Sequence, residues 1–189
     1  MTSPNSAPRQ RSPGRGSCVS ATKLPLPRRA TTDAEATLAR ECARLGSAWT
    51  LLRPTLIYGG ADDDSVTGDD GNDSLYGDAG QDSIDGGAGN DTVDGGADID
   101  VVYGGSQNDV LFGGSEDDSV YGGSEDDSLY GGSGKDILSG GVGNDTIDGG
   151  TEDDFIDGGA DNDVILGGDA NDSILGGSAN DSIFGDAGM

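Results

Sequence analysis

A nine-residue unit repeats fourteen times between Gly59 and Phe184 without an insertion or a deletion. The unit reads Gly-Gly-x-x-x-Asp-x-aliphatic-x, and we call its positions columns one to nine. Column one is Gly and column six is Asp in every copy, while column eight is always Val, Leu or Ile. A short period kept over so many copies predicts a solenoid in which each unit stacks on its relatives.

The columns divide into turn residues and strand residues. Columns one and two are mostly Gly, which accepts positive φ, and column five is often Asn or Asp, so columns one to six predict a turn. Columns seven to nine predict a short strand, as in Ser65-Val66-Thr67, with the column-eight side chain pointing inward. Such strands become stable only by stacking in parallel on their copies. Two units, or 18 residues, would make one coil, and the fold class expected is an all-β solenoid of about seven coils.

Charge divides the chain at Tyr58. Residues 1–58 carry nine basic and three acidic residues, a balance of +6, whereas residues 59–189 carry 33 acidic residues and one base, a balance of −32. High charge with few apolar residues is typical of a disordered chain, which is the expectation for the repeats without a ligand. The strict register argues against permanent disorder. A nucleic-acid partner is excluded for the repeats, because their field would repel phosphate.

The repeats also indicate which ligand would order them. The chain has no His, so a metal site would use oxygen ligands, which suit a hard cation such as calcium. Stacked coils would place the column-six carboxylates in two rows, about 4.8 Å apart, where neighbours repel by roughly 1 kcal/mol. A calcium ion between coils would neutralise the carboxylates and accept turn carbonyls as further ligands. Its binding energy would then become folding energy.

The units resemble the RTX, or haemolysin-type, calcium-binding repeat, Gly-Gly-x-Gly-x-Asp-x-aliphatic-x, over about two-thirds of the chain. The resemblance implies a right-handed parallel β-roll that holds calcium between turns two units apart, with at most twelve interior sites. It also implies that the ligands are the column-six carboxylates and backbone carbonyls around the Gly positions. The expected metal-site residues are Asp64, Asp73, Asp82, Asp91, Asp100, Asp109, Asp118, Asp127, Asp136, Asp145, Asp154, Asp163, Asp172 and Asp181, with Gly71, Gly80, Gly89, Gly134 and Gly143.

Column four departs from that family pattern. It is Gly in five units only, and elsewhere it is Asp, Glu, Gln or Ala. If the position requires positive φ, Glu, Gln and Ala cost about 1 kcal/mol or more each. A backbone carbonyl ligand survives these changes, so the sites should weaken and still exist. Our hypothesis is that the tightest sites lie in units 68–94 and 131–148.

The residues before the repeats predict two further segments. Residues 1–30 are rich in Pro, Arg and Ser and predict a disordered basic leader. Residues 31–58 predict a short helix, beginning at the capping box Thr32-Asp33-Ala34-Glu35, and then an extended segment. Residues 33–60 resemble part of the NAD-dependent epimerases of the extended short-chain dehydrogenase family, chiefly in the string Leu-Arg-Pro-Thr-Leu-Ile-Tyr-Gly. That family's Gly-rich phosphate loop and Tyr-x-x-x-Lys pair are absent, so an enzyme is not expected.

The expected function is calcium binding that folds a secreted or cell-surface module. Extracellular calcium modules bind at about 0.1–1 mM, so the chain would stay loose inside a cell and fold outside. The resemblance implies an enzyme, toxin or adhesin as a missing passenger domain, and the chain stops inside a fifteenth unit, which suggests a fragment of a larger exported protein. No N-terminal signal peptide and no transmembrane stretch is visible.

Two alternatives remain open at the level of sequence. The chain could be a structural or adhesive surface protein that self-associates through its end coils or an aromatic face. Column nine places Tyr103 two units from Tyr121, and Phe112 two units from Tyr130, so each pair is expected to stack on an outer face. The other alternative is a degenerate epimerase.

Overall fold

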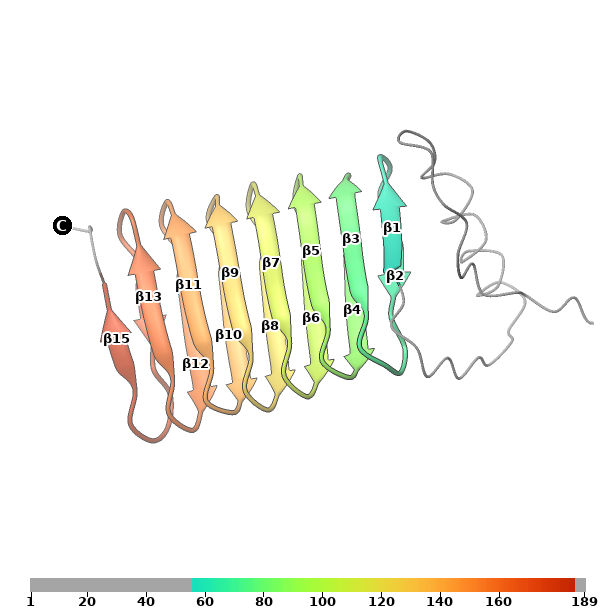
Figure 1. Ribbon diagram of the computed structural model, residues 1–189. Helices are drawn as coiled ribbons and strands as arrows, with labels where there is room; N and C mark the ends of the chain where they lie inside the picture. Colours follow the sequence, from blue (N-terminus) through green and yellow to red (C-terminus); the bar gives the residue numbers. More distant parts are fainter. Residues whose placement is uncertain (1–55, 186–189) are drawn as a thin grey trace, which may run out of the picture. The chain divides into compact units, whose positions relative to one another are not determined.

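The repeats form a parallel β-solenoid in the computed structural model, which describes residues 56–185 (Figure 1). The predicted basic leader (1–30) and the predicted helix with most of its extended segment (31–55) lie outside the described residues. The described part is all strand and turn, and it contains no helix of the length and apolar character needed to cross a membrane. The strands are β1 Leu56–Gly60, β2 Ser65–Thr67, β3 Ser74–Ala79, β4 Ser83–Ala88, β5 Thr92–Ala97, β6 Val101–Ser106, β7 Val110–Ser115, β8 Ser119–Ser124, β9 Ser128–Ser133, β10 Ile137–Val142, β11 Thr146–Thr151, β12 Phe155–Ala160, β13 Val164–Gly168, β14 Ser173–Leu175 and β15 Ser182–Phe184.

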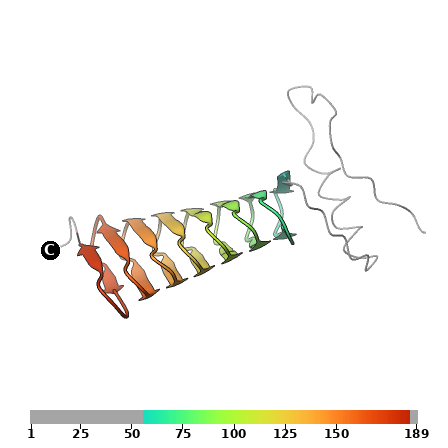
Figure 2. The ribbon, with the colours of Figure 1, turned by 60° about the horizontal axis from the view of Figure 1, so that its bottom comes forward.

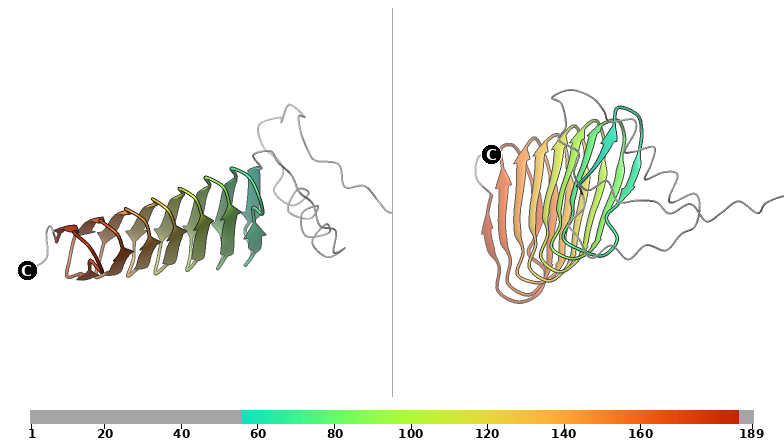
Figure 3. Two further views of the ribbon diagram at one scale, coloured as in Figure 1. Left: turned by 90° about the horizontal axis from the view of Figure 1, so that it is seen from below. Right: turned by 45° about the vertical axis from the view of Figure 1, so that its right-hand side comes forward.

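Each coil consists of two units, as the sequence predicts. The odd-numbered strands form an eight-stranded sheet in the order β1-β3-β5-β7-β9-β11-β13-β15, and the even-numbered strands form a seven-stranded sheet from β2 to β14. Each strand from β1 to β13 pairs in parallel with the strand two further along, so that Leu75 lies opposite Val93, 18 residues later. The two sheets face each other as layers (Figures 2 and 3). The predicted parallel β-roll of about seven coils is therefore confirmed.

The strands extend further than the sequence suggested. Strands β3 to β12 are six residues long and run from column seven through column three, so the predicted division into a three-residue strand and a six-residue turn was wrong. In β3 the burial alternates through Leu75 and Gly77, because column one also faces inward. The ladder resumes after it, with Asp78 opposite Gly96 and Ala79 opposite Ala97. Glycine hides this continuity in the sequence, since it has no side chain to reveal the period of two.

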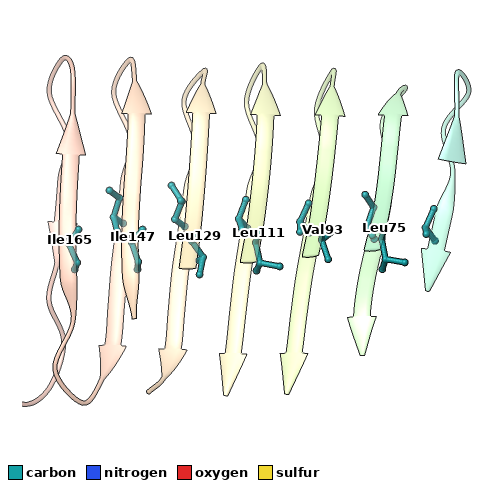
Figure 4. Packing of buried hydrophobic residues seen from close by; sticks show 12 residues of the cluster. Leu75, Val93, Leu111, Leu129, Ile147 and Ile165 are labelled. Atoms are coloured by element: carbon teal, nitrogen blue, oxygen red, sulfur yellow. The ribbon is translucent and has the colours of Figure 1, made fainter. Parts of the chain in front are cut away.

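The core is a line of column-eight side chains between the sheets. Twelve of them, from Val66 to Ile165, are buried, and Figure 4 shows them pointing into the space between the strands. Burial of each such side chain contributes about 1.5–3 kcal/mol. The line ends at the C-terminus, where Ile174 is partly buried and Ile183 is 47% exposed. Twelve of the fourteen column-eight side chains, which the sequence predicts to point inward, are thus buried in the core.

Aromatic side chains stack along the outer faces of both sheets. Tyr103 stacks on Tyr121 with ring centroids 5.1 Å apart, and Phe112 stacks on Tyr130 at 5.0 Å, which confirms both expected pairs. A third pair, Tyr58 and Tyr76, was not predicted because Tyr58 precedes the first unit. Each stack links neighbouring coils and adds about 0.5–1.5 kcal/mol.

Candidate metal centre

The column-six aspartates are buried inside the roll. From Asp73 to Asp163 each is at most 3% exposed, and Asp64 is 8% exposed. At the C-terminal end Asp172 and Asp181 are half-buried. Columns six, eight and one all face inward, so each carboxylate lies between the turn and the aliphatic line. We call these fourteen aspartates the inner row.

In twelve of the inner aspartates, from Asp82 to Asp181, one carboxylate oxygen accepts a hydrogen bond from the preceding coil. The Asp100 amide donates to Oδ1 of Asp118 at 2.8 Å, and the Asp100 carbonyl accepts from the Ser119 amide at 2.9 Å. Twelve such amide-to-Oδ1 bonds join aspartates 18 residues apart. Coils are therefore joined through these side chains as well as through the strands, which sequence reasoning missed.

The second oxygen of most inner carboxylates is buried and has no hydrogen-bond partner. Such an atom costs about 1–3 kcal/mol, and more when it is charged. Its repetition in coil after coil indicates a place for a positively charged ligand rather than an accident of packing. These Oδ2 atoms belong to Asp82, Asp91, Asp100, Asp109, Asp118, Asp127, Asp136, Asp145, Asp154, Asp163 and Asp172.

Because the column-one glycine has no side chain, there is space beside it for Oδ2 of the inner aspartate. A Cβ placed on Gly104 would lie 2.5 Å from Oδ2 of Asp109 and 2.7 Å from the carbonyl oxygen of Gly122. Gly104 does not have positive φ, so conformational freedom does not explain the glycine of column one. The residue is Gly in all fourteen units because a carboxylate and a carbonyl approach its Cα closely.

Burial raises the pKa of the ten inner carboxyl groups from Asp82 to Asp163. Desolvation is the largest cause, the amide hydrogen bond opposes it, and charges on other acids add to it. The pKa rises to about 7 for Asp109, Asp118, Asp127 and Asp154. It rises to about 6 for Asp82, Asp100, Asp136 and Asp145.

The acids of columns four and five differ from the inner row because they lie on the outside of the turns. Glu125 Oε2 accepts from the Gln107 amide at 3.0 Å and from Ser124 Oγ at 2.8 Å. Asp153 forms an ion pair with Lys135 at 2.8 Å. These hydrogen bonds lower the pKa of Glu125, and the lysine together with amide donors lowers the pKa of Asp153 to about 2. Asp126, which accepts two bonds from Asn144, also has a lowered pKa.

Column four has positive φ in every unit except the first. Glycine there has φ of 122–138°, whereas Asp, Glu, Gln and Ala have φ of 71–88°. The condition on which our column-four hypothesis depends is therefore met. The left-handed region costs a non-glycine residue about 1–2 kcal/mol. The glycine turns at Gly71, Gly80, Gly89, Gly134 and Gly143 avoid that cost.

The donor set fits a hard cation if backbone oxygens contribute. Among residues 56–185 no three His, Cys, Asp or Glu side chains converge, so side chains alone do not form a coordination shell. Calcium takes six to eight oxygen ligands and readily uses backbone carbonyls. Buried, partnerless carboxylate oxygens beside the glycine carbonyls are of the required chemical type. Zinc and copper fit poorly, since the whole sequence contains no His.

A comparison with protein-family models gives the same result as the geometry. The RTX calcium-binding nonapeptide repeat matches in overlapping copies that together span residues 58–188, more than half of the chain. A search among curated proteins finds no match. The matched segments include every inner aspartate and every column-four glycine. The chain therefore belongs to the family of RTX calcium-binding nonapeptide repeat proteins.

Proposed function

We propose that the roll is a calcium-dependent folding module, loosely structured without calcium and ordered when calcium occupies the turns. The single observation that carries this proposal is the row of buried Oδ2 atoms that no donor satisfies. Ionised, these carboxylates destabilise the metal-free roll, and a divalent cation removes the penalty. The ligands would be the inner-row carboxylates and carbonyls around the Gly positions. Calcium would supply charge neutralisation and crosslinking between coils, with no catalytic step.

The proposed place of action is outside the cell, as a secreted or surface-exposed module. Calcium sites of extracellular modules bind at about 0.1–1 mM, which matches extracellular and not cytosolic calcium. The acidic repeats, with a balance of −32, would repel one another and remain extended before they meet calcium. A chain that folds only after export avoids premature folding inside the cell.

Site strength would differ along the roll. Units with glycine in column four adopt the turn without left-handed strain, so 68–94 and 131–148 should hold calcium most tightly. The C-terminal units 167–184 have Ala170 and Ala179 in column four and only half-buried inner aspartates. They should lose calcium first as the free concentration falls. Loss from 68–94 with retention at 167–184 would refute this order.

The test is a calcium titration of the full chain by far-UV circular dichroism, with magnesium as the control. We expect a cooperative gain of β-sheet signal in calcium at about 0.1–1 mM and little response to the same concentration of magnesium. Magnesium prefers rigid octahedral geometry and keeps its water. A flat response to calcium, or an equal response to both ions, would overturn the proposal.

A further inference from the structure

One aspartate on the outer face of the roll lies between two aromatic residues. In β5, Asp94 is opposite Tyr76 of β3 on one side and opposite Phe112 of β7 on the other. Figure 1 shows these three strands side by side in one sheet. All three residues occupy column nine, and we call them the aromatic–acid row. Because aspartate is shorter than tyrosine or phenylalanine, the two rings extend past the carboxylate and leave space for a ligand between them.

The two rings present their free faces to Asp94. Tyr76 is stacked on Tyr58 with ring planes 18° apart, and Phe112 is stacked on Tyr130 with ring planes 12° apart. One face of each ring is therefore covered by its stacking partner, and the other is directed along the roll toward the coil of Asp94. Stacked rings in adjacent coils lie 4.9–5.1 Å apart, so Tyr76 and Phe112, two coils apart, are separated by about 10 Å. A cation midway would be about 5 Å from each ring, within the range of cation–π attraction.

The Asp94 carboxylate has no counter-charge among the described residues. Within residues 56–185 it accepts no hydrogen bond and forms no ion pair. The residue is half-buried, and burial raises the pKa of Asp94, with the negative charge of Asp78 adding to the rise. A bound cation would offset this loss of hydration.

The other column-nine aspartates show that this arrangement is not a general property of the unit. Asp85 and Asp148 are each opposite one aromatic and one non-aromatic residue. Asp157 is opposite Ser139 and Leu175 and has no aromatic neighbour in its ladder. All of these aspartates precede a Gly-Gly pair, as Asp94 does. The chain therefore contains its own control for the two flanking rings.

We propose that the aromatic–acid row binds a quaternary ammonium group, the trimethylammonium head of a molecule such as choline. Its methyl groups would contact both ring faces, and Asp94 would supply the counter-charge. Such a cation spreads its charge over apolar methyl groups and is recognised by aromatic faces. Calcium is a hard cation that requires several oxygen ligands, so the two ligands would occupy different parts of the roll. The acidic field of the repeats would concentrate either cation near the surface.

The test is a choline titration of the full chain in saturating calcium, followed by proton NMR of the choline methyl groups. Their signal should shift upfield on binding, because the methyl groups would lie over two ring faces. Asp94→Ser and Asp157→Ser form a matched pair, since each removes one charge from column nine, where serine occurs at Ser139. Phe112→Leu removes one ring of the row. Its control, Tyr121→Leu, removes a stacked ring that has no aspartate opposite it.

We expect a dissociation constant of about 1–10 mM for the wild type, Asp157→Ser and Tyr121→Leu. Binding should weaken at least about threefold in Asp94→Ser and in Phe112→Leu. The neutral analogue 3,3-dimethylbutanol, which has the shape of choline without its charge, should also bind at least about threefold more weakly. Binding of either row variant or of the neutral analogue at wild-type strength would overturn the proposal. So would the absence of a methyl shift up to about 30 mM choline.

Two further measurements assign the source of the ligand and check the fold. Sedimentation with phosphatidylcholine vesicles, lost in Asp94→Ser, would assign the trimethylammonium group to a lipid head group, whereas choline binding without sedimentation would assign it to a free solute. The row exists only in a folded roll, and to that extent it rests on the proposed function. A β-sheet signal by circular dichroism without choline binding would overturn this site alone. Absence of the β-sheet signal in calcium would overturn the proposed function and the site with it.

Discussion

Neighbouring acids in the same turn lie in opposite environments. Asp153 is exposed on the outside of its turn, pairs with Lys135, and has its pKa lowered to about 2. Asp154, the next residue, is 3% exposed, and burial raises its pKa to about 7. Asp126 and Asp127 show the same contrast: hydrogen bonds lower the pKa of Asp126, and burial raises the pKa of Asp127 to about 7. All four residues are aspartates, so the position in the unit decides whether the protein stabilises the ionised carboxylate. The protein stabilises it in column five and not in column six.

The comparison assigns different roles to the two sets of acids. Most of the outer acids of columns four and five accept hydrogen bonds from amides, a hydroxyl or a lysine, so the protein stabilises their charge without a ligand. From Asp82 to Asp172 each inner carboxylate accepts one amide hydrogen bond, as Asp145 does from the Asp127 amide, and its Oδ2 has no donor. A high count of acidic residues is therefore a poor measure of metal binding. We therefore expect the inner row, and not the outer acids, to depend on calcium.

The largest effect is expected where the inner carboxylate has no room to move. Gly104→Ala places a Cβ 2.5 Å from Oδ2 of Asp109, which must then shift. Overpacking of this kind costs about 1–3 kcal/mol. The calcium midpoint of folding, followed by circular dichroism, should rise accordingly. Ser106→Ala, in column three of the same unit, is the control and should change it little. Equal effects of the two variants would mean that the inner position is not special.

The next largest expected effect is the pH dependence of the roll's stability. This dependence should have opposite signs without and with calcium. Eight inner carboxyl groups, Asp82 and Asp109 among them, have a pKa of about 6–7 when folded against about 3.9 when unfolded. The folded state then binds more protons between these values, so the metal-free roll loses stability as pH rises from 5.5 to 8. The outer Asp153, with a pKa of about 2, contributes no change in this window.

Far-UV circular dichroism at pH 5.5 and pH 8, without calcium, measures this dependence as the residual β-sheet signal, which should be larger at pH 5.5. With calcium present the order should invert, because protons compete with calcium for the same carboxylates. A metal-free roll that is equally stable at both values, or more stable at pH 8, would contradict a desolvated inner row.

The smallest effect on the calcium midpoint is expected for substitutions of the outer acids. Glu125→Gly removes left-handed strain worth about 1 kcal/mol but also the bonds from the Gln107 amide and Ser124. The net change should stay within about 1 kcal/mol, toward slightly tighter calcium binding. Glu125→Gln keeps the side chain and removes its charge, so it should leave the calcium midpoint unchanged. A large loss in either variant, seen by calcium titration, would show that outer acids hold the ion.

Periodicity predicted the architecture because each column recurs in the same environment. The two-unit coil, the column-eight core and the stacking of Tyr103 on Tyr121 all follow from positions 18 residues apart. The extension of the strands through column one could not be read from the sequence. Glycine has no side chain to show which way it faces, so columns six, eight and one do not look like an inward-facing set.

The burial of the inner row was missed for a related reason. Aspartate before a strand is typical of an exposed turn residue. Only the structure shows that Asp118 faces inward and accepts the Asp100 amide. The exposure of Ile183 has a different origin, since it depends on the absence of a following coil among the described residues and not on the unit itself.

The most direct test of the inner row compares Asp127→Asn with Asp126→Asn by calcium titration of folding. Asparagine keeps an Oδ1 acceptor for the Asp109 amide in the first variant and for the Asn144 amide in the second. Each variant removes one negative charge from the same turn, so net charge is matched. We predict a calcium midpoint about tenfold higher for Asp127→Asn, because it loses a charged ligand. Asp126→Asn should remain within about twofold of the wild type. Equal shifts, or a larger shift for Asp126→Asn, would contradict the assignment of calcium to the buried carboxylates.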